Sequence, residues 1–156
     1  MKKHFTATAY IVSKIDGQYK ILLHKHKKMG IWIGIGGHIE DDENPFEALL
    51  REVWEETNLK IELLNNGKLL KTDGVEELIN PAAILQEKIP TLKDEPAHFH
   101  IDLIYFATCK NPDDIKMEEQ YDWFSLSDLK RKQFEKEVAY LSRKILRLLT
   151  YQYKVW

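Results

Sequence analysis

The chain has 156 residues, of which 44% are hydrophobic, and its 23 basic and 25 acidic residues give a formal net charge of −2. This is the size and composition of one globular domain with a full core, so we expect a single domain over residues 1–156. The near balance of basic and acidic residues gives no large positive charge that would indicate binding to nucleic acid or to an anionic membrane. Cys109 is the only cysteine, which excludes an internal disulfide and a cysteine-rich zinc site.

The first predicted elements are two β-strands, at about residues 4–13 and 19–26, rich in β-branched and aromatic residues. Asp16-Gly17 supplies the turn between them, so we predict a β-hairpin. Threonine and lysine residues interrupt the opening apolar run before it reaches the length of a secretory leader. No later stretch approaches the ~20 apolar residues of a membrane span. We therefore predict a cytoplasmic protein with no membrane partner.

The end of this hairpin carries candidate substrate-binding residues. His24 and His26 lie in the sequence HKHKK, which either supplies cations to substrate phosphates or forms a solvated hairpin end. A short strand follows with Trp32, which either stacks on a nucleotide base or packs in the core. Three glycines between residues 34 and 37 then shape a loop.

A helix is predicted from Asn44 to about Thr57. Asn44 is its N-cap, Pro45 occupies the first helical position, and Glu47 completes a capping box. At about 100° per residue, one side of the helix forms an apolar stripe that we expect to be buried. This stripe consists of Phe46, Leu49, Leu50, Val53 and Thr57.

The opposite side of this helix concentrates carboxylates at Glu52, Glu55 and Glu56. Like charges four residues apart cost a few tenths of a kcal/mol, and Arg51 can clamp the cluster without neutralising it. A divalent cation would match the remaining charge, and an all-oxygen site with water suits Mg²⁺ or Mn²⁺. The alternative is a solvated helix face, because glutamate is a good helix former.

Three further strands are predicted, near residues 60–64, 82–89 and 98–109, followed by a strand end and turn at 122–129. From about residue 132 the apolar spacing becomes helical, with steps of three and four. The residues of that stripe are Phe134, Val138, Leu141, Ile145 and Leu148. This order predicts an α/β or α+β fold in which helices cover a mixed sheet in three layers.

Two later segments hold weaker candidates for a site. His98, His100 and Asp102 share one face of the predicted strand by period-two alternation. They either point toward a substrate or an ion, or form a simple polar sheet face. Tyr121 is a further candidate for stacking on a base.

Residues 37–59 resemble the Nudix box, Gly-x5-Glu-x7-Arg-Glu-U-x-Glu-Glu-x-Gly-U, in which U is a bulky aliphatic residue. The matching residues are Gly37, Glu43, Arg51, Glu52, Val53, Glu55, Glu56 and Leu59. Asn58 stands where the box has glycine, but asparagine also tolerates the left-handed conformation that ends a helix.

The resemblance to the Nudix hydrolase family implies a fold, an activity and a metal. The family's fold is an α/β/α sandwich with a mixed sheet. Its enzymes cleave the P–O–P bond of a nucleoside diphosphate derivative by metal-assisted attack of water. Mapped onto this sequence, the Mg²⁺ (or Mn²⁺) ligands are Glu52, Glu55, Glu56 and the carbonyl of Gly37.

The resemblance also implies supporting and proton-accepting residues. Glu43 would interact with the residues around the metal without binding the metal itself, and Arg51 would hold the glutamates in place. The general base is either a helix glutamate, most simply Glu52, or a glutamate of a later loop, where Glu118 and Glu119 are the candidates. The last two are equally well explained as surface charges.

Two other functions remain open at this point. A Nudix-shaped module could bind a nucleotide or regulate without turnover, and an acidic helix could serve a protein interface without any metal. For the enzyme, nucleoside triphosphates, ADP-ribose and dinucleoside polyphosphates all qualify as substrates. We expect a monomer or homodimer with a nucleotide-type substrate and no nucleic-acid partner.

Overall fold

A computed structural model of the chain describes residues 1–65, 67–93, 95–116 and 120–151. The strands are β1 (Lys3–Ile15), β2 (Gln18–Lys25), β3 (Trp32–Ile33), β4 (Ile35–His38), β5 (Ile61–Leu63), β6 (Lys71–Thr72), β7 (Val75–Glu76), β8 (Ala83–Ile89), β9 (His98–Cys109) and β10 (Tyr121–Phe124). The helices are α1 (Pro45–Thr57), α2 (Asp128–Arg131) and α3 (Lys136–Tyr151), with a 3₁₀ turn at Pro112–Asp114.

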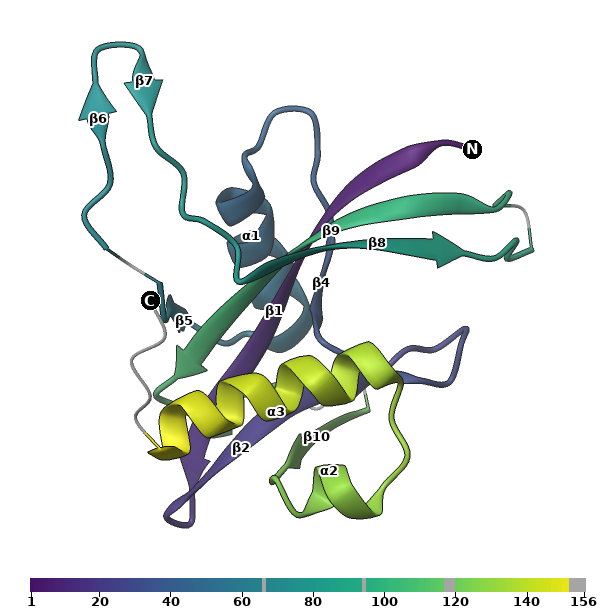
Figure 1. Cartoon of the computed structure of the whole chain (residues 1–156), viewed down its shortest axis with the longest axis vertical. Helices are drawn as coiled ribbons and strands as arrows, with labels where there is room; N and C mark the ends of the chain where they lie inside the picture. Colours follow the sequence, from purple (N-terminus) through teal and green to yellow (C-terminus); the bar gives the residue numbers. More distant parts are fainter. Residues whose placement is uncertain (66, 94, 117–119, 152–156) are drawn as a thin grey trace.

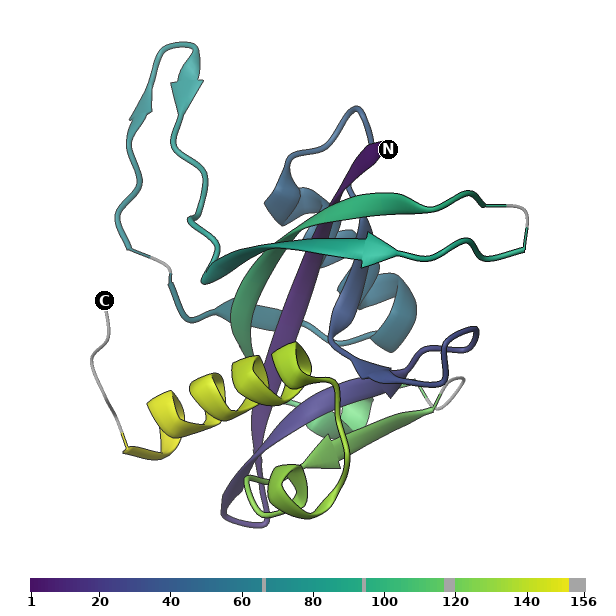
Figure 2. The same ribbon diagram turned by 45° about the vertical axis from the view of Figure 1, so that its right-hand side comes forward.

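The main sheet is mixed and centres on β1 and β9, which run parallel to each other (Figure 1). Its path is β10-β2-β1-β9-β5. The short strand β4 pairs antiparallel with the beginning of β1, and β2 pairs with the end of β1. On the other side, β8 and β5 pair antiparallel with opposite ends of β9. The hairpin β6–β7 forms a separate small sheet that projects from the body of the molecule (Figure 2).

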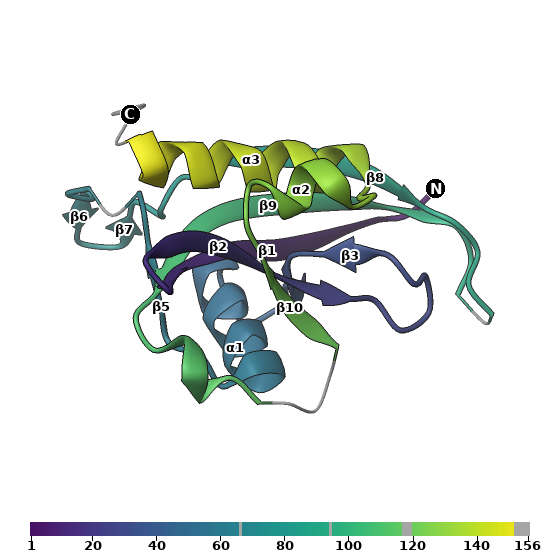
Figure 3. The same cartoon turned by 90° about the horizontal axis from the view of Figure 1, so that it is seen from below.

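Helices α1 and α3 cover opposite faces of the sheet (Figure 3). Side chains alternate along β1, so Ala7, Ala9 and Ile11 join the core under α1 while Tyr10 and Val12 join the core under α3. The two buried clusters make three layers. The predicted α/β/α sandwich with a mixed sheet is therefore confirmed.

The predicted caps of α1 are confirmed. The Asn44 side chain accepts hydrogen bonds from the amides of Phe46 (2.9 Å) and Glu47 (3.1 Å), and the Glu47 carboxylate accepts from the Asn44 amide (2.8 Å). The helix ends at Asn58, whose φ of 61° is left-handed. An asparagine thus fills the position where the box has glycine.

The predicted buried stripe of α1 needs one correction. Leu50 is 38% exposed, whereas Ala48, which is not included in the predicted stripe, is fully buried. The helix is turned so that Glu52 lies against Gly37 of β4 and Leu50 faces solvent. This rotation brings part of the acidic side against the sheet.

The chain after β10 also differs from its prediction. A separate helix, α2, ends at Arg131, and α3 begins at Lys136 rather than at about residue 132. The Asp128 carboxylate accepts hydrogen bonds from the amide and the hydroxyl of Ser125, which builds a local turn that the apolar spacing did not indicate. Among the described residues, no helix combines the length and apolar character that a membrane crossing requires.

Candidate active site

The candidate site lies where the end of β4 meets the middle of α1. A Cβ atom on Gly37 would lie 2.5 Å from the carboxylate carbon of Glu52, which is closer than Cβ atoms approach other groups. A Cβ on Gly36 would lie 2.1 Å from the carbonyl oxygen of Ala7 in β1. Both glycines therefore let the backbone of β4 approach its neighbours more closely than a side chain would permit.

Arg51 organises the carboxylates around this point. Its guanidinium binds both carboxylate oxygens of Glu43, with Nε to Oε2 at 3.0 Å, and donates to Oε1 of Glu52 at 2.8 Å. It also donates to the backbone carbonyl of His38 (3.1 Å) and, more weakly, to Glu55 (3.5 Å). The hydrogen bonds from Arg51 and from the Glu40 amide hold the pKa of Glu43 below its usual range. One arginine thus connects α1, the loop before it and the end of β4.

Glu56 borders the other side of the cluster. Its carboxylate Oε2 lies 4.0 Å from Nδ1 of His24 in β2, and its backbone carbonyl accepts a hydrogen bond from the Tyr121 hydroxyl at 2.7 Å. The rings of His24 and Tyr121 meet edge to face with their centroids 5.8 Å apart. The structure therefore brings two of the sequence-predicted substrate-binding residues to the glutamate cluster.

The donor set fits a small divalent cation. Glu52, Glu55 and Glu56 project from one side of α1, and the Gly37 backbone faces Glu52 without an intervening side chain. Carboxylate and carbonyl oxygens are the ligands that Mg²⁺ and Mn²⁺ prefer. The side chain of Glu55 is 58% exposed, and that of Glu52 is 17% exposed. The cluster is thus open to solvent on one side and anchored on the other.

A comparison with protein families agrees with this geometry, because the model of the NUDIX domain matches residues 4–147. The chain belongs to the Nudix family. A crystal structure of a Nudix-family hydrolase from Clostridium perfringens superposes with a TM-score of 0.75 at 32% identity, over 96% of this chain and 99% of that one. A binary complex of a Caenorhabditis elegans Ap4A hydrolase superposes with a TM-score of 0.66 at 20% identity, over 95% and 98% of the two chains.

A curated relative matches over a shorter region. This MutT-like protein from Streptomyces ambofaciens is 37% identical over 60 residues, which is 38% of this Nudix chain and 38% of the relative.

Two further sequence-predicted residues, Trp32 and His26, make contacts outside the glutamate cluster. Trp32 packs edge-on against Phe124, with ring centroids 5.0 Å apart, in the core under α3. His26 accepts a hydrogen bond from the Met29 amide (3.2 Å) within the turn after β2. Glu118 and Glu119, the alternative bases, lie outside the described residues.

The polar residues of β9 form a separate group on the sheet face opposite α1. Asp102 accepts hydrogen bonds from the hydroxyls of Thr6 (2.8 Å) and Thr8 (2.9 Å) and is almost fully buried, which raises its pKa. His98 and His100 gather instead with His4 and His38. Sequence reasoning did not select these last two histidines, because the pairing of β1 with β9 joins residues about a hundred positions apart and leaves no local signal.

Proposed function

We propose that this Nudix protein is a Mg²⁺-dependent pyrophosphohydrolase, with Mn²⁺ as a substitute, that cleaves the diphosphate linkage of a nucleoside diphosphate derivative. The observation that carries the proposal is the arginine-centred carboxylate cluster of Glu43, Glu52 and Glu55 beside Gly37. A solvated helix face has no need of a glycine that makes room for the Glu52 carboxylate, or of an arginine that donates to three carboxylates. The arrangement is that of a preorganised ligand set.

In this proposal each residue has a defined task. Glu52, Glu55, Glu56 and the Gly37 carbonyl would hold the cation, which would supply positive charge for phosphate oxygens and a water of lowered pKa. Arg51 fixes the orientation of Glu52, and Glu43 in turn fixes Arg51. Glu52 accepts the proton of the attacking water, with Glu118 and Glu119 as the alternatives.

The substrate belongs to the class of nucleotides joined through a diphosphate. His24 and Tyr121 lie beside Glu56, where they would contact a phosphate or a base of the substrate. The C. elegans structural neighbour is named as an Ap4A hydrolase, which makes dinucleoside polyphosphates one member of the test panel. ADP-ribose and nucleoside triphosphates are the others.

The test is hydrolysis of this panel with Mg²⁺ or Mn²⁺, measured as release of phosphate, pyrophosphate and mononucleotide. We expect Glu55→Gln and Glu56→Gln to abolish metal-dependent turnover while circular dichroism and the melting temperature stay near those of the wild type. The reason is that each variant removes a charged ligand but keeps the size of the side chain, at the exposed Glu55 and at the partly buried Glu56 beside His24.

Glu62→Gln is the matched control, because it removes an exposed carboxylate of β5 that pairs with Lys110, the residue after β9. Full turnover in a folded Glu56→Gln variant would refute the metal site. Tight binding of ADP-ribose or another panel member by the wild type, without turnover of any of them, would instead indicate a nucleotide-binding module.

A further inference from the structure

Four histidines meet on the sheet face opposite α1, away from the glutamate cluster. They are His4 of β1, His38 of β4, and His98 and His100 of β9. His4 lies directly opposite His100 in the parallel ladder, and His38 lies opposite Thr6, two residues along β1 from His4. Residues paired in this way present their side chains on the same face. One ring nitrogen from each histidine lies within 4.8 Å of the others.

We propose that this histidine quartet binds a Zn²⁺ ion. Imidazole nitrogens are preferred ligands of Zn²⁺ but not of Mg²⁺, and four of them complete the tetrahedral shell of a structural zinc site. Zn–N bonds of about 2.0–2.1 Å place tetrahedral ligand atoms about 3.3 Å apart. The Nε2 atoms of His98 and His100 are already 3.0 Å apart, and one nitrogen each of His4 and His38 lies within 4.8 Å of them.

The partner of His98 on its other ring nitrogen supports this assignment. Nδ1 of His98 lies 3.0 Å from the carbonyl oxygen of Pro96, a contact that requires the proton on Nδ1. This contact leaves Nε2 of His98 to face His100 and the ion. Histidines that ligate metals almost always donate their second N–H to a carbonyl or carboxylate in this manner.

The electrostatic setting of the quartet also suits a dication. A carboxylate oxygen of Glu95 lies 3.7 Å from Nε2 of His98, where it would balance part of the charge of the ion.

The quartet is next to the proposed Mg²⁺ site in the sequence but is separate from it. Gly37 faces Glu52 and α1, whereas the side chain of the following residue, His38, meets His100 on the opposite side of the sheet, with ring centroids 4.9 Å apart. The ion would tie together the beginning of β1, the end of β4 and the beginning of β9. Its ligands share no atom with the carboxylate cluster.

The test uses the full chain, expressed without a polyhistidine tag and stripped of metal. Zn²⁺ is titrated against a chromophoric chelator in millimolar Mg²⁺, which occupies the carboxylate cluster, and Co²⁺ serves as the spectroscopic probe for tetrahedral ligands. We expect one Zn²⁺ per chain. The double variant His98→Ala/His100→Ala should bind Zn²⁺ at least about 100-fold more weakly, and so should His38→Ala, whose exposed side chain can be removed without opening the core.

Two control variants locate the ion. His26→Ala removes a histidine outside the quartet, and Glu52→Gln damages the carboxylate cluster; both should bind Zn²⁺ as the wild type does. Binding should also raise the wild-type melting temperature by about 5–10 °C at a Zn²⁺ concentration a hundred times Kd, with no rise for His38→Ala. Absence of wild-type binding, binding that survives in folded His38→Ala, or binding that Glu52→Gln abolishes would each overturn the proposal.

Discussion

At Gly37 the absence of a single methyl group decides how closely β4 approaches the carboxylate of Glu52. We predict that Gly37→Ala lowers kcat by about 100-fold, because the new Cβ displaces the Glu52 carboxylate by an ångström or so from its place beside Arg51. The melting temperature should change little. The displaced group is the free end of a flexible side chain, and Gly37 does not have a positive φ that alanine would strain.

The control for this prediction is Gly67→Ala, since no atom lies within 4 Å of the added Cβ at that position. Steady-state kinetics of both variants against the substrate found in the panel make the comparison. Equal kcat values for Gly37→Ala and the wild type would mean that the position of Glu52 does not govern turnover.

At the scale of the element, α1 depends on its first turn for the position of every glutamate. We predict that Asn44→Ala lowers the free energy of unfolding by about 1 kcal/mol, because the amides of Phe46 and Glu47 lose their acceptor. The melting temperature should fall by about 2–4 °C in thermal unfolding followed by circular dichroism. Asn44→Ser keeps an acceptor and should recover most of the loss; an equally large loss in Asn44→Ser would show that the cap is not the cause.

The sequence predicted those elements whose residues follow the period of their own structure. The β-branched and aromatic run of β1 and the caps of α1 are local signals, and both predictions are confirmed. The rotation of α1 about its axis was not predicted, because it depends on how closely Glu52 approaches β4. The hairpin β6–β7 also escaped prediction, since its strands are exposed on both faces and show no apolar period, although Asp73-Gly74 is a turn signal.

At the scale of the whole molecule, the two candidate sites differ in how far apart their residues lie in the sequence. Arg51, Glu52 and Gly37 lie within one short segment, so their spacing in the sequence was enough to select them. The histidine quartet instead combines three strands, and only the parallel pairing of β1 with β9 brings His4 to His100. Long-range pairing of this kind cannot be inferred from a single sequence by periodicity.

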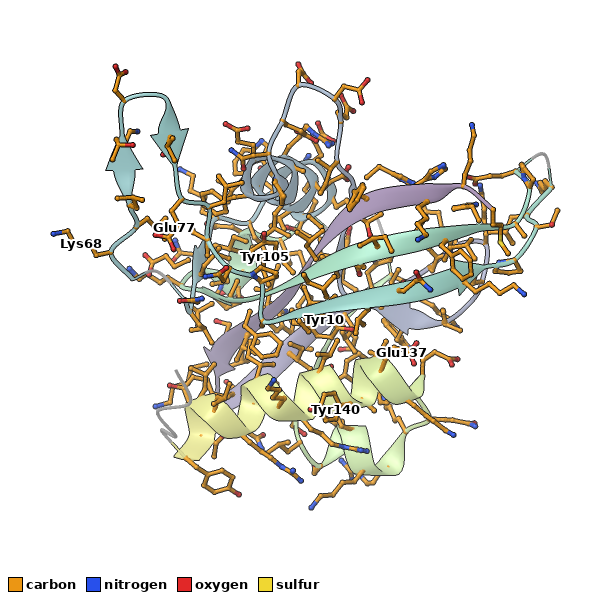
Figure 4. The ribbon with its side chains drawn as sticks, turned by 45° about the horizontal axis from the view of Figure 1, so that its top comes forward. Tyr10, Lys68, Glu77, Tyr105, Glu137 and Tyr140 are labelled. Carbon is orange, nitrogen blue, oxygen red and sulfur yellow. The ribbon has the colours of Figure 1, made fainter. Side chains whose placement is uncertain are left out.

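A second polar group lies on the α3 side of the sheet, farther along the face that carries the histidine quartet. Glu87 of β8 lies opposite His100 in the ladder, and Asp102 follows on β9. Tyr10 of β1 lies between the sheet and α3, and Glu137 belongs to the first turn of α3 (Figure 4). Burial, together with the charges of Asp102 and Glu137, raises the pKa of Glu87 to about 7. Burial and the same carboxylates also raise the pKa of the Tyr10 hydroxyl.

The raised pKa of Glu87 predicts a pH-dependent stability. Below about pH 4.5 Glu87 is protonated in both the folded and the unfolded chain, and its contribution to stability is fully present. As the pH rises to about 7, the unfolded chain releases this proton while the folded protein retains it, so the free energy of unfolding falls by that contribution. Glu87→Gln should therefore gain about 1–2 kcal/mol relative to the wild type between pH 4.5 and 8, measured as the difference between their urea-unfolding free energies. The pKa of His100 is lowered, so protonation of this ring destabilises the fold as the pH falls. Because the wild type and the variant share this effect, it largely cancels in the difference between their unfolding free energies. The exposed Glu62→Gln control should show no such rise. A constant difference between Glu87→Gln and the wild type over this range would show that Glu87 is already ionised in the folded protein at pH 5.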